Sequence, residues 1–564
     1  MRRHLRRRLW LVPLCASAVA LTGAVGPITS SSASASASTS TVTITACNNR
    51  TNDSLPKLLE CIRTDDLWNQ MKAQQAIADS HPDAGGHASR NSGEPGYKAA
   101  VDLAVKLFTA AGYHVTVQTY KFPYFAFFGL PGGSEVSPTP TTFTLGTDLN
   151  AFNSVGTVTA EVQPVGGIIL PPTPAPSSAS GCSPADFANF TPGNIALIQR
   201  GTCNFGEKAK NAVTAGAAGV LIFNEGQPGR TGLAGGGGMI DDAGNSVVPN
   251  IPVGFVPFAE GQHLYDAANA LQHPQVTLDF KGEVDPSRDD YNVIADSPYG
   301  DPAHTVVVDA HYDAIFGAGM LDNASGSVSL MDVAQKLAKV RTTNRLRYIL
   351  FGGEELGLLG SNFYTHNLSP TELAQIGYDL DADVTATPNY TIGVLDPAAK
   401  NLFGGPIPVF PANVYEPSKF ARDVAVKYYD SIGLNHEFFS PQGTDAFWFN
   451  MVGVPASGIL TGQDCCKTQE QVDLFGGQTG NFEGNLGTTD GGCVDQPFRW
   501  CDNLSNNDPN VLTFETKAFA TMVFKMAFDT TILTRTPQQA VAARTAAEQQ
   551  KAARMAGAIQ ARMR

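Results

Sequence analysis

The chain has 564 residues, more than one hydrophobic core supports, so two or three domains are expected. Hydrophobic residues make up 43% of the chain and charged residues 16%, which is typical of a globular protein and excludes wholesale disorder. A formal net charge of −14 argues against a nucleic-acid partner.

The N-terminal segment has the order of a secretory signal peptide. Five arginines lie among the first eight residues, an apolar stretch follows up to about Val25, and a run of small residues comes next at 30–40. The alternative is a membrane anchor, but the apolar stretch is short and contains Pro13 and Gly23. We therefore expect residues 1–38 to be cleaved, the protein to be secreted, and no stable membrane anchor to remain.

The cysteines agree with export. One of the nine leaves with the signal, and an even number in an exported chain indicates disulfides. Closeness in sequence predicts the pairs Cys47–Cys61 and Cys182–Cys203, and a cluster of the last four. None of the eight lies in a CxxC pattern, so a zinc site built on thiolates is not expected. The last four cysteines are Cys465, Cys466, Cys493 and Cys501.

Two segments precede the most regular part of the chain. Residues 55–149 are mostly helical at first, and the segment 103–122 predicts a helix that stops near Gly112 and then an alternating strand. A Pro/Gly-rich stretch from about 123 breaks this pattern and is a candidate boundary. Residues 150–285 have low charge, and the segment 193–224 predicts a strand, a tight loop, a helix and a second strand.

Residues 286–533 alternate apolar strands with amphipathic helices. This order predicts a largely parallel sheet with helices on both faces, and such sheets bind ligands at the carboxyl ends of their strands. The tail at 534–564 is rich in Ala, Gln and Arg and predicts a helical extension, either solvated or packed on the domain.

The first cluster of polar residues lies in the segment 306–326. His311 and Asp313 lie just past an apolar strand, and Asp322 lies in a Gly-rich loop before a helix. Imidazole nitrogen and carboxylate oxygen are both good zinc ligands. Asp313 can accept the other ring N–H of His311 and fix its tautomer, and Asp322 can bridge two metals.

Two further strands end in acidic residues. Glu354 and Glu355 follow one apolar strand, and Asp383 ends another. Burial of adjacent carboxylates is costly without a cation, and two adjacent glutamates can divide the roles of metal ligand and general base. A strand-end histidine is often structural and Glu-Glu pairs are usually solvated, but three successive strands that end this way predict a metal site.

These segments resemble the M28 family of zinc exopeptidases with two co-catalytic metals. The matching motifs are HYD (311–313), LDNASG (321–326), GGEELGLLGS (352–361), the Asp383 segment and the loop NSGEPGY (91–97). The segment 193–224 resembles the protease-associated (PA) domain, which some members carry as an insertion. The resemblance covers roughly residues 55–530. It implies a mixed, largely parallel α/β sheet flanked by helices, with an inserted β-rich α/β domain at 150–285 and catalytic residues at 286–533.

The resemblance also implies roles for the candidate residues. His311 and Asp383 would bind one zinc, Asp322 would bridge both ions, and Glu355 would bind the second. Glu354 would be the general base, and Asp313 would orient His311. The implied reaction is attack of a metal-bound hydroxide on the carbonyl of the first peptide bond of a peptide or protein substrate. Cobalt or manganese can occupy the same ligand set.

The sequence departs from the family pattern in two places. The family's last ligand is a histidine in a Cys-Tyr-His segment, but no histidine follows His436 in this chain. Alignment on Cys493 places Asp495 there, and alignment on Cys501 places Phe498 there. Asp495 is therefore either a substitute zinc ligand or a solvated loop residue. In the segment QGTDAFWF (442–449), Gly443 and Ala446 replace the family's Arg and His.

Three functions remain open from the sequence. The first is a secreted di-zinc aminopeptidase. The second is a carboxypeptidase or dipeptidase of the same fold, which a basic clamp for a substrate carboxylate would favour. The third is a catalytically impaired single-zinc or binding protein, motivated by the missing histidine. Glu354 beside Glu355 argues against the third, because a pure binder needs no general base.

Overall fold

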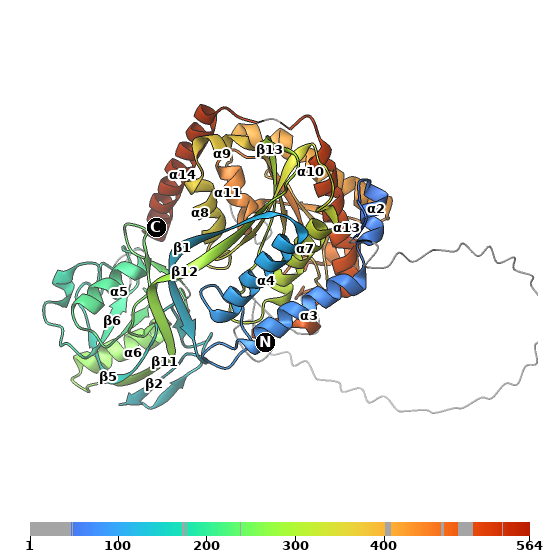
Figure 1. The fold of residues 1–564 in the computed structure, drawn as a ribbon. Coiled ribbons are helices and arrows are strands. Elements are labelled where there is room, and N and C mark those ends of the chain that lie inside the picture. Colours follow the sequence, from blue (N-terminus) through green and yellow to red (C-terminus); the bar gives the residue numbers. More distant parts are fainter. Residues whose placement is uncertain are drawn as a thin grey trace, which may run out of the picture. The chain divides into compact units, whose positions relative to one another are not determined.

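The computed structural model describes Cys47 and residues 49–171, 174, 178–236, 238–400, 408–463, 467–482, 500–532 and 534–563, with side chains up to 550. The expected signal peptide at 1–38 lies outside the described residues. Two eight-stranded sheets organise the chain (Figure 1). The second sheet is formed mainly by residues between two strands of the first.

The first sheet is mixed, and its central strands are parallel. Its order is β1-β12-β14-β13-β15-β18-β16-β17. β13 pairs in parallel with β14 and β15, and β15 pairs in parallel with β18. β12 pairs antiparallel with both β1 and β14. The strands are β1 (His114–Phe127), β12 (Gly282–Asp296), β13 (Asp301–His311), β14 (Asn344–Phe351), β15 (Ile376–Ala382), β16 (Gly393–Leu395), β17 (Glu437–Phe439) and β18 (Ala456–Leu460).

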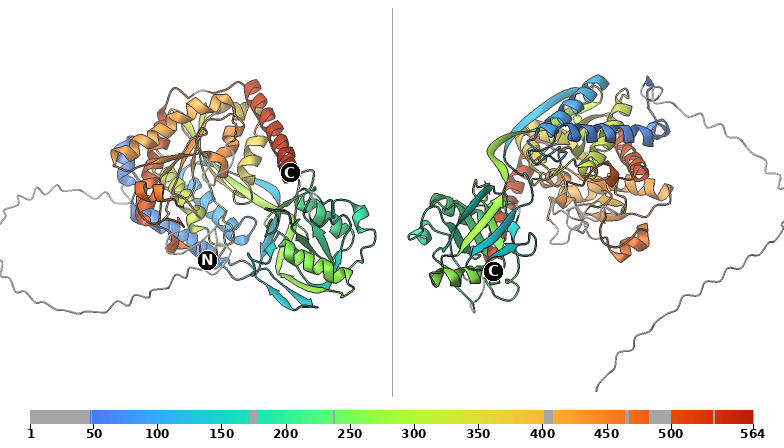
Figure 2. Two further views of the ribbon diagram at one scale, coloured as in Figure 1. Left: turned by 180° about the vertical axis from the view of Figure 1, so that it is seen from behind. Right: turned by 90° about the horizontal axis from the view of Figure 1, so that it is seen from below.

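Helices cover both faces of this sheet, as the sequence predicted (Figure 2). Successive strand residues point to opposite faces, so Val306 and Val308 join one apolar core and Val307 the other. Helices α2 (Leu55–Cys61), α3 (Thr64–Ser80), α4 (Pro95–Ala111), α7 (Ser325–Leu337), α10 (Ala412–Ser431) and α13 (Pro509–Phe528) contribute to the first core. Helices α8 (Leu359–Asn367), α9 (Pro370–Gln375), α11 (Ala446–Met451) and α14 (Pro537–Met563) contribute to the second.

The second sheet has the order β3-β2-β11-β5-β6-β7-β10-β4. It belongs to the insertion between β1 and β12, which pair with each other along their length. The fold class predicted from the sequence is thus confirmed. The elements are β2 (Gly132–Ser137), β3 (Thr141–Phe143), β4 (Asn150–Ala151), β5 (Gly156–Pro164), β6 (Ile195–Gln199), α5 (Phe205–Thr214), β7 (Gly219–Phe223), β8 (Met239–Ile240), β9 (Ser246–Val247), β10 (Val253–Val256), α6 (Phe258–Asn269) and β11 (Gln275–Phe280).

Two predicted disulfides are confirmed, Cys47–Cys61 and Cys182–Cys203. Cys501 is also disulfide-bonded, whereas Cys465, Cys466 and Cys493 lie outside the described residues.

The predicted C-terminal helix is α14, and it packs on the domain. Arg535, just before it, donates hydrogen bonds to the carbonyls of Val452 (Nη1) and Leu373 (Nη2, 2.8 Å). Among the described residues, no helix combines the length and the apolar character of a membrane span.

Candidate metal centre

The candidate ligands come from the carboxyl ends of neighbouring parallel strands. His311 is the last residue of β13 and pairs with Phe351 of β14, three positions before Glu354. Asp383 follows β15, the other neighbour of β13. Because these parallel strands end at one edge, side chains that are far apart in sequence meet there.

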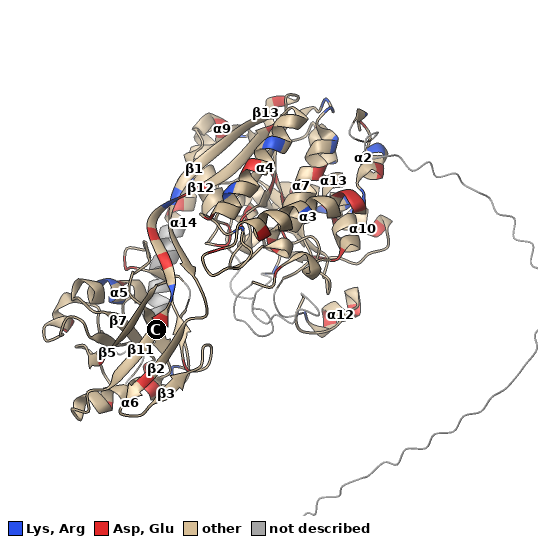
Figure 3. Cartoon of the chain, turned by 60° about the horizontal axis from the view of Figure 1, so that its bottom comes forward, with Lys and Arg blue, Asp and Glu red and all other residues tan. Residues whose placement is uncertain are grey.

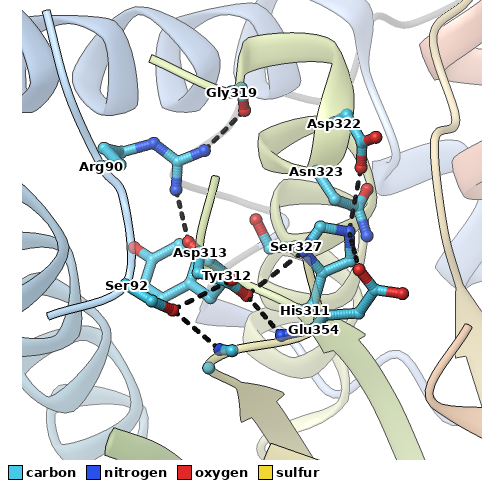
Figure 4. Close-up of polar contacts among 12 residues, drawn as sticks. Arg90, Ser92, His311, Tyr312, Asp313, Gly319, Asp322, Asn323, Ser327 and Glu354 are labelled. Carbon is cyan, nitrogen blue, oxygen red and sulfur yellow. Dashed lines mark hydrogen bonds and ion pairs between the residues drawn. The ribbon is translucent and has the colours of Figure 1, made fainter. Parts of the chain in front are cut away.

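Three of the predicted residues form one buried group. His311 Nε2 lies 2.9 Å from Asp322 Oδ1 and 3.3 Å from Asp383 Oδ1. One ligand atom from each residue lies within 4.8 Å of the other two. A single ring N–H does not satisfy two carboxylate oxygens at once, whereas a divalent cation binds both oxygens and the nitrogen. Glu354 Oε2 lies 4.0 Å from the same His311 nitrogen (Figure 4).

Asp313 lies between the two strand ends and contacts both. Its Oδ1 lies 3.4 Å from His311 Nδ1 and accepts a hydrogen bond from the Glu354 backbone amide at 3.2 Å. Ser92 Oγ donates to Asp313 Oδ2 at 3.0 Å and accepts from the Gly353 amide at 2.8 Å. One buried carboxylate therefore contacts the imidazole and the segment that carries Glu354 (Figure 4).

The side chain of Arg90 holds the loop that carries Asp322. The guanidinium of Arg90, which is fully buried, donates to the carbonyls of Tyr312, Ala318 and Gly319. Figure 4 shows Arg90 between the strand end and this loop. Five N–H donors on a rigid plane suit Arg to this task, because they reach several carbonyls without internal flexibility.

Burial and the neighbouring carboxylates shift the pKa of His311 in opposite directions. Burial lowers the pKa of His311, but the carboxylates of Glu354, Asp313, Asp322 and Asp383 outweigh it, and the pKa stays well above its usual value. Burial raises the pKa of Glu354 well above its ordinary range, and that of Asp383 as well. A concentration of negative charge in a buried place is what a bound cation stabilises.

The two remaining proposed ligands, Glu355 and Asp495, are not part of this described group. Glu355 follows Glu354 directly but is only partly buried and does not join the three-residue group. Asp495 lies outside the described residues, as does Phe498. Gly443 and Ala446 lie beside Asp381, since Thr444 Oγ1 donates to Asp381 and the Ala446 amide donates to Asp381 Oδ2 at 3.4 Å.

Sequence reasoning missed a second layer of buried carboxyls behind the ligands. They are Asp309 on β13, Asp379 and Asp381 on β15, and Asp445 before α11. Burial raises the pKa of Asp381 to about 7, and those of the other three well above their usual value. Burial thus disfavours the charged form of all four carboxyls. The alternation Asp379, Asp381, Asp383 was a sequence signal for the two carboxyls on β15, because residues two apart share one face of a strand.

Comparisons with known proteins identify the family of the chain. The sequence profile of "Peptidase family M28" matches residues 292–497, and that of the "PA domain" matches residues 160–264. An aminopeptidase of Pseudomonas aeruginosa (strain UCBPP-PA14) is 32% identical over 485 residues, which cover 84% of this chain and 83% of the relative. The chain belongs to peptidase family M28. This M28 peptidase carries the PA domain as an insertion.

Other relatives and solved structures extend the likeness. A probable leucine aminopeptidase 2 of Aspergillus fumigatus is 35% identical over 308 residues, 53% of this chain and 57% of the relative. The solved aminopeptidase from Aneurinibacillus sp. strain AM-1 has a TM-score of 0.55 at 19% identity and covers 86% of this chain and 98% of its own. BSAP, a zinc aminopeptidase from Bacillus subtilis, has a TM-score of 0.51 at 22% identity, covering 83% and 96%. These two structures support the fold.

Proposed function

We propose that this M28 peptidase is a secreted, zinc-dependent aminopeptidase that releases N-terminal residues from peptides or proteins. The observation that carries the proposal is the buried group of His311, Asp322 and Asp383, with the Glu354 carboxylate 4.0 Å from the imidazole. The names of the relatives, which are aminopeptidases, support the reaction class. The signal-like N-terminus and the disulfides support secretion.

The residues present fit a zinc ion. One imidazole and two carboxylates are a ligand set that zinc accepts. In the proposal His311 and Asp383 hold one zinc, Asp322 bridges, and Glu355 with Asp495 holds a second. When bound, zinc supplies a Lewis acid that polarises the scissile carbonyl and lowers the pKa of water. Asp313 Oδ1 lies 3.4 Å from His311 Nδ1, and in the proposal it accepts the Nδ1–H when metal is bound, which leaves Nε2 as the ligand atom.

Glu354 is the proposed proton carrier. Its carboxylate removes a proton from the attacking water and delivers it to the departing amine. Burial raises its pKa, which makes the carboxylate a stronger base than an exposed glutamate. The hydrogen bond from the Glu354 amide to Asp313 fixes the backbone from which the side chain projects.

The missing family histidine favours a second candidate, a single-zinc protein without peptidase activity. No histidine follows His436 in the sequence. If Asp495 does not replace it, the second zinc lacks a ligand and only the group around His311 remains. The lysines and arginines of the described chain are scattered over its elements in Figure 3. The names of the relatives are those of aminopeptidases, so we favour an aminopeptidase over a carboxypeptidase.

Metal content and substrate preference test the proposal together. The secreted protein is analysed for zinc and incubated with matched peptides that carry free or acetylated N-termini, before and after chelation. Two zincs and chelator-sensitive cleavage of the free peptides alone support the aminopeptidase. One zinc and no cleavage support the second candidate, and cleavage from the C-terminus overturns both.

A further inference from the structure

A cavity of about 310 Å³ opens between α3, α4 and α7, away from the candidate metal centre. The three helices cover the same face of the first sheet (Figure 1). None of its lining residues belongs to the candidate ligand set. The volume lies at the lower end of the range for small-molecule sites, so the cavity suits a small ligand.

One end of the cavity is formed by buried charges. Asp66 is 7% exposed, Asp332 is fully buried, and Lys336 is 3% exposed. The Lys336 ammonium lies 3.7 Å from a carboxylate oxygen of each aspartate, beyond hydrogen-bond distance. Two carboxylates and one ammonium leave an excess of one negative charge. Burial raises the pKa of Asp332 to about 6, so this excess is present at neutral pH.

Three acceptor atoms at this end remain without a donor. Within the described chain, neither oxygen of Asp66 and only one of Asp332 accepts a hydrogen bond; that one, Oδ1, accepts from Gln70. A buried acceptor without a donor costs free energy, on the order of 1–3 kcal/mol each. Three acceptors equal in number the three N–H groups of a primary ammonium.

The cavity also has an apolar lining. Leu103 and Leu107 of α4 and Met331 of α7 contribute to it. An acidic end with an apolar wall matches a short amphiphilic cation. It does not match an anion, which would meet the excess negative charge.

We propose that this cavity binds a small primary ammonium compound with a short apolar group, its ammonium at Asp66 and Asp332 and its apolar part against Leu103, Leu107 and Met331. A free amino acid and a simple alkylamine share this chemistry. The ligand completes the hydrogen bonds of the three acceptors, which is the source of its specificity.

A direct path leads from the cavity to the strand end that carries His311. Gln74, which lines the cavity, donates from Nε2 to the Tyr312 hydroxyl at 2.8 Å. Tyr312 lies between His311 and Asp313, and its carbonyl accepts from Arg90. Occupancy of the cavity therefore changes the surroundings of a residue that links two members of the metal centre.

Calorimetric titration of the purified full chain at pH 8 tests the site. The probes are leucine, 3-methylbutylamine, which lacks the carboxylate, and 4-methylpentanoate, which lacks the ammonium. Both amines are expected to bind and 4-methylpentanoate is not. Asp66→Asn is expected to weaken the binding of both amines by about tenfold or more, because a neutral amide loses the charge attraction.

Two further variants make the result specific. Ala73→Trp, at an exposed position of the rim, blocks entry and leaves the charges in place, and it is expected to weaken the amines equally. Asp65→Asn removes the same charge from an exposed position of the same helix turn and is expected to change nothing. Amine binding that persists in both Asp66→Asn and Ala73→Trp, binding of 4-methylpentanoate as tightly as the amines, or no binding at all overturns the proposal.

The effect on turnover is measured separately, and only this arm rests on the proposed aminopeptidase activity. At saturating peptide, 3-methylbutylamine is expected to change kcat of the wild type and not of Ala73→Trp. An equal effect in both overturns the link through Gln74. An inactive wild type defeats the proposed function alone, because the calorimetric result stands without turnover.

Discussion

The carboxylate of Asp502 accepts the backbone amide of Asp322 at 3.0 Å, although the two residues lie 180 positions apart in sequence. Its other oxygen accepts the amide of Leu321 at 2.8 Å. Two consecutive amides of the ligand-bearing loop are thus held by one buried side chain. The position of Asp322 therefore depends on a side chain outside the candidate ligand set.

We expect Asp502→Asn to reduce zinc affinity and kcat/KM by about 10- to 100-fold. The amide side chain keeps one acceptor, but its NH₂ group faces an N–H of the loop, so one hydrogen bond becomes a repulsion. Zinc titration and peptide cleavage measure the effect. Asp508→Asn is the matched control, because Asp508 also accepts two backbone amides but caps α13, where Asn serves equally well. Equal activity of Asp502→Asn and the wild type would contradict the assignment.

Ser92→Ala removes the hydroxyl that joins Asp313 to the Gly353 amide. The buried amide and carboxylate each lose a partner, at an expected cost of about 1–3 kcal/mol in transition-state stabilisation or folding. We expect kcat to fall by about tenfold with KM little changed, because Asp313 and Glu354 both shift. Ser80→Ala, at an exposed helix end, is the control and should behave as wild type. A change in KM alone would place Ser92 in substrate binding instead.

Glu354→Gln and Glu355→Gln form a pair that separates general base from ligand. The first is expected to keep its zinc and lose kcat by about 10²- to 10⁴-fold, since the amide cannot take a proton. The second is expected to lose zinc from the second site. Metal analysis beside single-turnover cleavage measures both. Retention of full metal in Glu355→Gln would contradict its role as a ligand. Loss of metal in Glu354→Gln would contradict its role as the general base alone.

The sequence predicted the fold where the local pattern decides it. The helix at 103–112 ends at Gly112, whose φ of 95° suits glycine, and the strand that follows was expected. Strands β2 and β3 were not expected, because residues 132–143 contain Gly, Ser, Thr and Pro without a clear apolar alternation. β3 pairs with β2, and β2 pairs with β11, which lies more than a hundred residues away in sequence. A local sequence pattern does not predict pairing at that distance.

In the candidate site too, a local sequence pattern predicts some residues and not others. His311, Asp322, Glu354 and Asp383 could be placed because each follows an apolar strand or opens a helix. Arg90 and Asp502 could not, since they bind backbone carbonyls and amides that carry no sequence signature. What a side chain does to the backbone of a distant loop becomes visible only when the chain is folded.

Glu515 makes the stability of the folded chain depend on pH. This residue of α13 is fully buried and accepts the Tyr429 hydroxyl of α10 at 2.7 Å. Burial raises its pKa from 4.5 to about 8, and the hydrogen bond from Tyr429 offsets only part of the shift. Below pH 4.5 the carboxyl is protonated in both the folded and the unfolded chain, so it contributes no pH dependence there.

Between pH 4.5 and 8 the unfolded chain releases this proton and the folded chain keeps it. The free energy of unfolding therefore falls by ~1.4 kcal/mol for each unit of rising pH within this window, and it stops falling above the window. Gln resembles the protonated side chain, so we expect Glu515→Gln to match the wild type near pH 5 and to exceed its thermal midpoint increasingly up to pH 8. Scans at three pH values measure the difference, with the exposed Glu470→Gln as a control that should show none. A difference between Glu515→Gln and wild type that stays constant with pH would mean that Glu515 is ionised in the folded protein.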